Sequence, residues 1–317
     1  MISYQDVLDA QKRISPYVLR TPLLRVPALD PILGCEVYIK SEALQFTGSF
    51  KLRGATNCML SLSDEQRRNG VVCGSSGNHA QGVACAAQRL GVSAVIVMPL
   101  GSNPVKIEGV KSFGGTVELY GERPSDKEVR VAELVKEGRC EIHPYDNDYV
   151  RAGQGTIGLE ILEDQPEIDA VVVPVGGGGL ISGIATAVKA IRPQAKMIGV
   201  EPEGAPRYTE SYRQGKLVWL EKTDTIADGT RTDHANANSF ELIRQRVDSL
   251  ATVSDDAIRQ AMKLIVSKAK IVAEPSSSMG IGAVLQGKLH FDASQKVCFV
   301  ISGGNNDLNL LADVIRG

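Results

Sequence analysis

Short runs of valine and isoleucine recur along this chain, and longer helix-like stretches separate them. The runs are mostly continuous rather than alternating, which is typical of parallel strands buried on both faces. We predict strands at Val37–Lys40, Gly70–Cys73, Ala94–Met98, Thr116–Tyr120, Ala170–Val175, Met197–Val200 and Val297–Ile301. We predict helices at His79–Leu90, Lys127–Lys136 and Leu180–Ile191. This alternation predicts an α/β fold with open, mainly parallel sheets and helices on both faces.

The strand–helix units form two groups in the 317-residue chain, one before about residue 147 and one after about residue 168. A chain of this length suits one large domain or two smaller ones. We therefore expect two lobes, a large domain of residues 1–69 and 148–317 and a small domain of residues 70–147. Because ligands bind open α/β sheets at the carboxyl ends of the strands, we expect the active site in the cleft between the lobes.

The composition argues against several classes of protein. A net charge of −2 and an aromatic content of 5% do not favour nucleic acid or an anionic membrane as a partner. Six cysteines without a C-x-x-C pair predict reduced, buried thiols rather than a zinc ribbon. No apolar run approaches the ~20 residues that span a bilayer, and the N-terminus lacks the apolar core of a signal peptide. We expect a cytoplasmic protein.

Four consecutive glycines, Gly176, Gly177, Gly178 and Gly179, follow a predicted strand and precede a predicted helix. Backbone N–H groups can converge in such a loop, and the helix N-terminus adds positive potential, so the pattern predicts a phosphate site. A tight turn is the alternative, although one or two glycines would serve it. The loop matches neither the G-x-G-x-x-G motif nor a P-loop, so the phosphate is expected to belong to a ligand other than NAD or ATP.

A second loop, "CGSSGNHAQG", places small polar side chains between a predicted strand and a predicted helix. Hydroxyls and an amide at a helix N-terminus suit a carboxylate ligand. A plain helix cap is the alternative, and a histidine here is more often structural than catalytic. The candidate substrate residues are Ser75, Ser76, Gly77, Asn78 and His79.

Three more residues stand where their side chains could do chemistry. Ser302 follows the predicted strand Val297–Ile301 and could bind a ring nitrogen or a phosphate, although a turn explains it as well. Glu274 lies between an alanine and a proline and is either a helix cap or a site carboxylate. Lys51, in "SFKLRGATN", would by itself be interpreted as a solvated surface charge.

Taken together, these stretches resemble the serine/threonine dehydratase and serine racemase family, which are pyridoxal-5′-phosphate enzymes of fold type II, the tryptophan-synthase-β-like class. The resemblance runs from about residue 5 to 315. Nine landmarks occur in the family's order: "TGSFKLRGA", "SSGNHAQG", "VMP", "AGQGTIGLEI", "GGGGLISG", "GVEPE", "ADG", "EPS" and "SGGNNDL". It implies a two-lobed enzyme with pyridoxal 5′-phosphate as cofactor, a small amino-acid substrate and a homodimeric assembly.

The resemblance also implies roles for single residues. Lys51 corresponds to the Schiff-base lysine and to the base that takes the α-proton, and Phe50 packs against the cofactor ring. The four glycines bind the cofactor phosphate. The loop from Ser75 to His79 binds the substrate carboxylate, and Asn78 also reaches the phenolic oxygen of the cofactor.

Ser302 corresponds to the residue that faces the pyridine nitrogen, and Glu274 is counted among the cofactor-binding residues. A neutral serine does not hold that nitrogen protonated as an aspartate would. The cofactor is therefore expected to be a weaker electron sink.

The implied reaction is α,β-elimination of L-threonine or L-serine to a 2-oxo acid and ammonia. One alternative is a serine or aspartate racemase, which needs a second acid/base opposite the lysine, and Ser76 holds that position. Another is a 3-hydroxyaspartate dehydratase. An NAD-dependent oxidoreductase would also explain the glycines, but the dinucleotide motif is missing.

Two features depart from the family pattern. Racemase-like members bind a divalent cation through a glutamate, a carbonyl four residues on and an aspartate six residues on, and Glu201, Ala205 and Arg207 occupy these positions. An arginine replaces an anionic ligand there, so we expect no metal at this place. Ser277 and Ser278 stand where alanine or glycine is usual, and their hydroxyls are expected to affect substrate choice.

Overall fold

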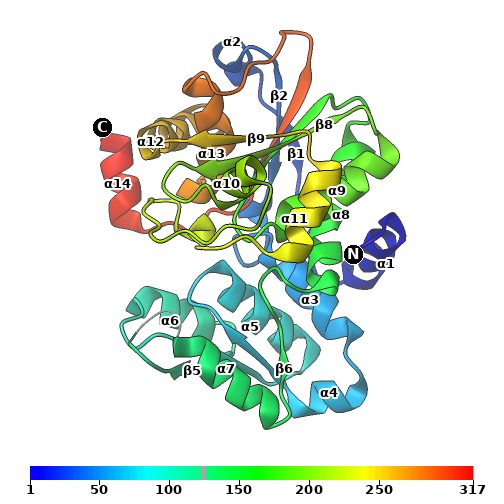
Figure 1. The fold of residues 1–317 in the computed structure, drawn as a ribbon, viewed down its shortest axis with the longest axis vertical. Helices are drawn as coiled ribbons and strands as arrows, with labels where there is room; N and C mark the ends of the chain where they lie inside the picture. The colour runs from blue at the N-terminus through cyan, green and yellow to red at the C-terminus, as the bar shows by residue number, and fades with distance from the viewer. Residues whose placement is uncertain (123–125, 317) are drawn as a thin grey trace.

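The computed structural model describes residues 1–122 and 126–316, and it contains two separate sheets (Figure 1). The larger has the strand order β1-β2-β10-β7-β8-β9, and the smaller has the order β5-β4-β3-β6. The strands are β1 (Leu23–Arg25), β2 (Glu36–Ser41), β3 (Val71–Gly74), β4 (Ala94–Met98), β5 (Thr116–Leu119), β6 (Cys140–Glu141), β7 (Ala170–Pro174), β8 (Lys196–Pro202), β9 (Ser249–Val253) and β10 (Lys296–Ile301).

Helices cover the sheets and connect the strands. They are α1 (Tyr4–Ile14), α2 (Asp30–Leu33), α3 (Lys51–Ser61), α4 (Asp64–Asn69), α5 (Asn78–Leu90), α6 (Pro104–Lys111), α7 (Asp126–Lys136), α8 (Asp148–Asp164), α9 (Gly179–Ile191), α10 (Arg207–Gln214), α11 (Ala237–Arg246), α12 (Asp255–Leu264), α13 (Pro275–Leu285) and α14 (Leu308–Arg316). Shorter helical turns are η1 (Pro27–Leu29), η2 (Glu42–Leu44), η3 (Asp228–Thr230) and η4 (Ile265–Ala269).

Most neighbouring strands are parallel, and β1 pairs with β2 in the antiparallel sense. Every residue of β4 and β7 is buried, as the continuous apolar runs predict. The predicted α/β class is confirmed. The sequence did not reveal β1, β6 or β9, because each is short or half-exposed and lies at the edge of its sheet.

The strands of the smaller sheet all lie between residues 71 and 141, and those of the larger sheet lie outside that range. We propose residues 70–147 as the small domain, and this division of the strands supports it. Helix α3 lies between the lobes (Figure 1). Its residues Leu52 and Met59 pack in one apolar cluster with Val71 and Ile96 of the smaller sheet. The helix that begins at Lys51 therefore contributes to the core of the small lobe.

Of the described helices, none is both long enough and apolar enough to cross a membrane. The six cysteines carry free thiols, and five of them are buried. Burial raises the pKa of the Cys35 and Cys58 thiols to about 12. Such thiols are protonated at neutral pH, so these two cysteines behave as apolar core residues.

Candidate active site

The four glycines form the turn from β7 into α9. Gly178 has a φ of +86°, a left-handed conformation that a side chain would strain. A Cβ atom on Gly177 would lie 2.2 Å from the ring of Tyr145, and one on Gly178 would lie 2.5 Å from the Tyr208 hydroxyl. Glycine is therefore required at Gly177 by space, and at Gly178 by both space and conformation.

The same loop exposes backbone donors. Within residues 1–122 and 126–316, the N–H groups of Gly176, Gly177 and Gly178 have no protein acceptor. They precede the N-terminus of α9, where the helix dipole favours an anion. The loop therefore fits a phosphate group, as the sequence predicts.

Lys51 is the first residue of α3 and lies where the two lobes meet. Its Nζ atom donates to the carbonyl oxygen of Pro144 at 3.2 Å and lies 5.0 Å from the centre of the Phe50 ring. Burial lowers the pKa of the Lys51 amine to about 8, while the Glu274 carboxylate acts in the opposite direction. At pH 7 roughly a tenth of this amine is uncharged, far more than for an exposed lysine, and an uncharged amine can attack a carbonyl carbon.

Asn78 and Glu274 connect the lobes. Asn78 begins α5 of the small lobe, and its Nδ2 atom lies 2.9 Å from both carboxylate oxygens of Glu274, which precedes α13. The Asn305 side chain in turn donates to the Asn78 oxygen at 2.8 Å. Glu274 is 5% exposed, and burial raises its pKa to about 7, although the hydrogen bond from Asn78 lowers it.

The candidate substrate loop connects β3 to α5. Ser75 and Ser76 are half-buried, and the Ser75 hydroxyl accepts a long bond of 3.4 Å from the N–H of Gly77. His79 is buried, and its Nε2 atom lies 2.6 Å from the Ile142 carbonyl oxygen. Burial lowers the pKa of His79 to about 3, so the ring is neutral and Nε2 carries the hydrogen. This places His79 in a bond to the backbone rather than in the open part of the loop.

Ser302 follows β10 directly and is 3% exposed. Its carbonyl oxygen accepts from the N–H of Phe50 at 3.0 Å, which connects it to the residue before Lys51. Its hydroxyl oxygen lies 3.0 Å from the hydroxyl oxygen of Ser277. The bond between Phe50 and Ser302 and the bridge between Ser49 and Gly303 bring the start of α3 to the end of β10.

Some residues of this region could not be recognised as part of the site from the sequence. Tyr145 contacts the glycine loop and Pro144 accepts from Lys51, but both lie in an irregular segment without periodicity. Lys106 of α6, which had no signal in the sequence, forms a 3.0 Å ion pair between the lobes with Asp228 of η3, which lies in the "ADG" landmark. Asn305 lies within the "SGGNNDL" landmark, which was a usable signal.

Arg207 is completely buried at the start of α10, beside the glycine loop. Its guanidinium group donates to the carbonyl oxygens of Thr230 at 2.6 Å, Thr232 at 2.7 Å and Val175 at 2.9 Å. Its Nε atom lies 3.4 Å from a carboxylate oxygen of Glu201, which is also buried. Burial lowers the pKa of Arg207 and raises that of Glu201, and their mutual attraction opposes both shifts. The result is a fixed positive charge among oxygen atoms.

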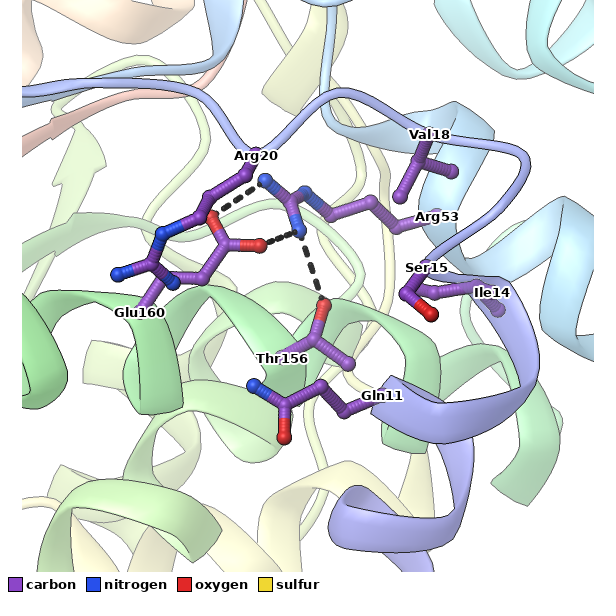
Figure 2. Close-up of a pocket in the computed structure, with 8 residues that line it drawn as sticks. All are labelled: Gln11, Ile14, Ser15, Val18, Arg20, Arg53, Thr156 and Glu160. Carbon is purple, nitrogen blue, oxygen red and sulfur yellow. Dashed lines mark hydrogen bonds and ion pairs between the residues drawn. The ribbon is translucent and has the colours of Figure 1, made fainter.

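A second buried charge cluster anchors α3 on its other side. Arg53, two residues after Lys51, forms ion pairs with Glu42 at 2.8 Å and with Glu160 at 2.6 Å, and Lys40 also pairs with Glu160 at 2.6 Å. Figure 2 shows the cavity beside this cluster, in which Arg53 also donates to Thr156. None of the residues predicted for the cofactor or substrate lines this cavity. The cluster therefore fixes the start of α3 and is not the active site.

Comparison with known proteins identifies the family. A family described as "Pyridoxal-phosphate dependent enzyme" matches residues 14–303. This chain belongs to that family. The family match establishes pyridoxal phosphate as the cofactor, for which the glycine loop and the Lys51 amine provide suitable groups.

Individual relatives within this family are similar over nearly the whole chain. An L-threonine ammonia-lyase of Thermotoga maritima is 43% identical over 100% of this chain and 79% of its own length. An L-threo-3-hydroxyaspartate ammonia-lyase of Saccharomyces cerevisiae is 41% identical over 99% of this chain and 97% of its own. The solved structure of maize serine racemase has a TM-score of 0.94 and 39% identity, and it covers 99% of this chain and 97% of its own.

Proposed function

We propose that this chain is an ammonia-lyase that converts L-threonine and L-serine to a 2-oxo acid and ammonia. The observation that carries the proposal is the Lys51 amine, whose pKa burial lowers to about 8 and which lies where the two lobes meet. The L-threonine ammonia-lyase that is 43% identical supports the choice of reaction.

The cofactor-binding groups follow from the same geometry. The free N–H groups of Gly176, Gly177 and Gly178 would hold the phosphate of pyridoxal 5′-phosphate. Gly179, the next residue, is the first residue of α9. Lys51 would hold the carbonyl carbon of the cofactor covalently. Phe50, Asn78, Glu274 and Ser302 would surround the ring, and their mutual contacts support this assignment.

In the reaction, the protein residues bind the substrate and move protons. The substrate carboxylate would be oriented by the hydroxyls of Ser75 and Ser76 and by the N-terminus of α5. Gly77 and Asn78 belong to the same loop, and His79 holds this loop in place through its bond to the Ile142 carbonyl oxygen. The substrate amine would replace Lys51 at the cofactor carbonyl carbon, and Lys51, then a free amine, would take the proton from the substrate Cα. The bound cofactor delocalises the electron pair that this proton leaves behind. The β-hydroxyl would depart as water with a proton that balances the one Lys51 takes from Cα, and hydrolysis of the remaining enamine would give the 2-oxo acid and ammonia.

A serine or aspartate racemase is a second candidate, because Ser76 provides a hydroxyl in the substrate loop. Ser76 is half-buried, and within the described residues its hydroxyl has no hydrogen-bond partner, so it is free to donate a proton to Cα. The likeness to maize serine racemase supports this alternative. The relative named for L-threo-3-hydroxyaspartate supports a 3-hydroxyaspartate dehydratase as a third.

We also propose that Arg207 supplies the positive charge that a divalent cation supplies in racemase-like members. It lies 3.4 Å from Glu201, which is one of the expected cation ligands, and it donates to the carbonyl oxygens of Val175, Thr230 and Thr232 rather than to that of Ala205. A cytoplasmic location is proposed because free, buried thiols suit a reducing compartment. A homodimer is proposed on the resemblance alone.

Product analysis tests the proposed reaction. The purified protein with pyridoxal 5′-phosphate is incubated with L-threonine, L-serine, 3-hydroxyaspartate and D-serine in separate reactions. We expect 2-oxobutyrate and pyruvate from the first two, whereas the opposite enantiomer as main product would favour the racemase. Lys51→Ala should lose both the visible absorbance band and the activity, and the exposed-lysine control Lys222→Ala should keep both.

A further inference from the structure

Ser277 and Ser302 bring two buried hydroxyl groups together at the end of β10. Ser277 belongs to α13 and is 2% exposed, and Ser302 is 3% exposed. Their Oγ atoms are 3.0 Å apart. The Ser277 Oγ atom also lies 2.7 Å from the carbonyl oxygen of Gly303 and 2.8 Å from the Gly303 nitrogen.

The hydrogen count and the bond lengths together assign the direction of these bonds. A serine hydroxyl has one hydrogen and two lone pairs. The N–H of Gly303 donates to one lone pair of Ser277, and the Ser277 hydrogen is directed to the Gly303 carbonyl at 2.7 Å. The second lone pair of Ser277 then faces Ser302, so Ser302 is the donor in the 3.0 Å contact.

The opposite arrangement would direct the Ser277 hydrogen to Ser302. The Gly303 carbonyl would still accept from the N–H of Glu274 at 3.1 Å, so the exchange would leave no orphaned group. However, it would replace a 2.7 Å bond by a 3.0 Å bond, and 2.7–2.8 Å is the commonest distance between hydroxyl and carbonyl oxygens. The geometry therefore favours Ser302 as donor to Ser277.

We propose that Ser277 makes Ser302 a hydrogen-bond acceptor toward the ring nitrogen of pyridoxal 5′-phosphate, so that this nitrogen keeps its proton. The inference rests on the proposed function, which places the ring nitrogen at Ser302. With its hydrogen directed to Ser277, Ser302 presents a lone pair, and an acceptor favours the protonated nitrogen. Ser277 acts through Ser302 and is a positioning residue. The consequence is a stronger electron sink than a lone serine would give, contrary to the expectation from sequence.

The charged groups nearby are bonded elsewhere. The Glu274 carboxylate accepts from Asn78, and the Lys51 amine donates to the Pro144 carbonyl. Within the described residues, neither side chain hydrogen-bonds to the Ser302 hydroxyl. The Ser277–Ser302 contact is therefore the local interaction that directs this hydroxyl.

The test measures the protonation state of the nitrogen itself. The holoenzyme is prepared with pyridoxal 5′-phosphate that carries ¹⁵N in the ring, and the nitrogen chemical shift is recorded by NMR at neutral pH. We expect the shift of a protonated pyridine in the unmodified protein and that of an unprotonated pyridine in Ser277→Ala. Ser278→Ala is the matched control, because its hydroxyl bonds to the carbonyl of Glu274 within α13, and it should keep the original shift. Ser277→Thr retains the hydroxyl and should also keep it.

Each result has one interpretation. An unprotonated nitrogen in the unmodified protein, or an unchanged shift in Ser277→Ala, overturns the inference. The variant Ser302→Ala shows whether the role of Ser277 or the proposed position of the ring nitrogen is wrong. If Ser302→Ala changes the shift and Ser277→Ala does not, only the role of Ser277 is wrong. If Ser302→Ala also leaves the shift unchanged, the ring nitrogen does not face Ser302, and the proposed placement fails together with the inference.

Discussion

The amide nitrogen of Asn78 lies 2.9 Å from both carboxylate oxygens of Glu274, although 196 residues separate them in the chain. One residue comes from the small lobe and the other from the large lobe, so the bond contributes to the position of α5 relative to α13. Glu274 is also nearly inaccessible to solvent, and burial raises its pKa to about 7. The protonation of one carboxyl group is thereby coupled to the contact between the lobes.

This coupling predicts a pH-dependent stability that Glu274→Gln removes. The pKa of Glu274 is 4.5 in the unfolded chain and about 7 in the fold, so the folded state binds more protons between these values. The stabilisation is complete below pH 4.5 and is lost as the pH rises through 7. Between pH 5 and pH 8 the free energy of unfolding of the cofactor-free protein should fall by up to about 3 kcal/mol more than that of Glu274→Gln.

Urea unfolding of both cofactor-free proteins at the two pH values measures this difference. Glu65→Gln changes an exposed carboxylate of α4 and should leave the pH dependence of the parent protein unchanged. Parallel pH profiles for Glu274→Gln and the parent would contradict the raised pKa.

Gly177→Ala should weaken cofactor binding. The added methyl group would lie 2.2 Å from the Tyr145 ring, so either the ring or the loop must move. The backbone N–H groups proposed for the phosphate would move with it, and we expect the dissociation constant for pyridoxal 5′-phosphate to rise at least about tenfold. Gly101→Ala is the control, because a methyl group there has no neighbour within 4 Å. Equal affinities of the two variants, measured by fluorescence titration, would argue against this loop as the phosphate site.

Much of the fold could be predicted because its strands are locally encoded. β4 was predicted with its observed bounds, Ala94–Met98, since burial on both faces requires a continuous apolar run. The glycine loop was visible for a similar reason, because a left-handed residue at Gly178 leaves a signal in the sequence itself.

The contacts between the lobes could not be predicted in this way. Neither Asn78 nor Glu274 carries a sign of its partner, because the bond exists only after α5 and α13 have been packed against their own sheets. The interaction of Tyr145 with the glycine loop depends on the same packing. The sequence therefore indicated which residues are unusual but not which of them touch.

Removal of divalent cations should leave this protein unaffected. Arg207 already provides a positive charge to the carbonyls of Val175, Thr230 and Thr232. Within the ranges that the structure describes, no group of three His, Cys, Asp or Glu side chains could hold a metal ion. Activity and melting temperature should be the same after dialysis against EDTA and after addition of Mg²⁺. A loss of either that Mg²⁺ restores would refute the proposed role of Arg207.

Arg207→Met should destabilise the protein strongly. The change leaves the buried Glu201 carboxylate without its counter-charge, and breaking a buried pair in this way costs about 3–5 kcal/mol. The double variant Arg207→Met/Glu201→Gln should recover part of this loss, since the unpaired charge is gone. Arg213 forms a surface pair with Glu210, and the free energy of unfolding of Arg213→Met should lie within about 1 kcal/mol of the parent value. Urea unfolding of these proteins and of the single variant Glu201→Gln completes the cycle. Additive effects of the two buried changes would show that the groups do not interact.

Ser76→Ala should separate elimination from racemisation. The Ser76 hydroxyl is proposed to donate a proton to the substrate Cα, a step that a racemase requires and that elimination by Lys51 does not. We therefore expect the rate of D-serine formation from L-serine to fall by about 10²–10⁴-fold, the usual contribution of a general acid. Pyruvate formation should change by less than about tenfold, because Ser75 and the α5 N-terminus still bind the carboxylate. Chiral chromatography of the remaining serine and an assay for pyruvate, run on the same samples, give both rates. Equal losses of the two activities would instead show that Ser76 serves in substrate binding.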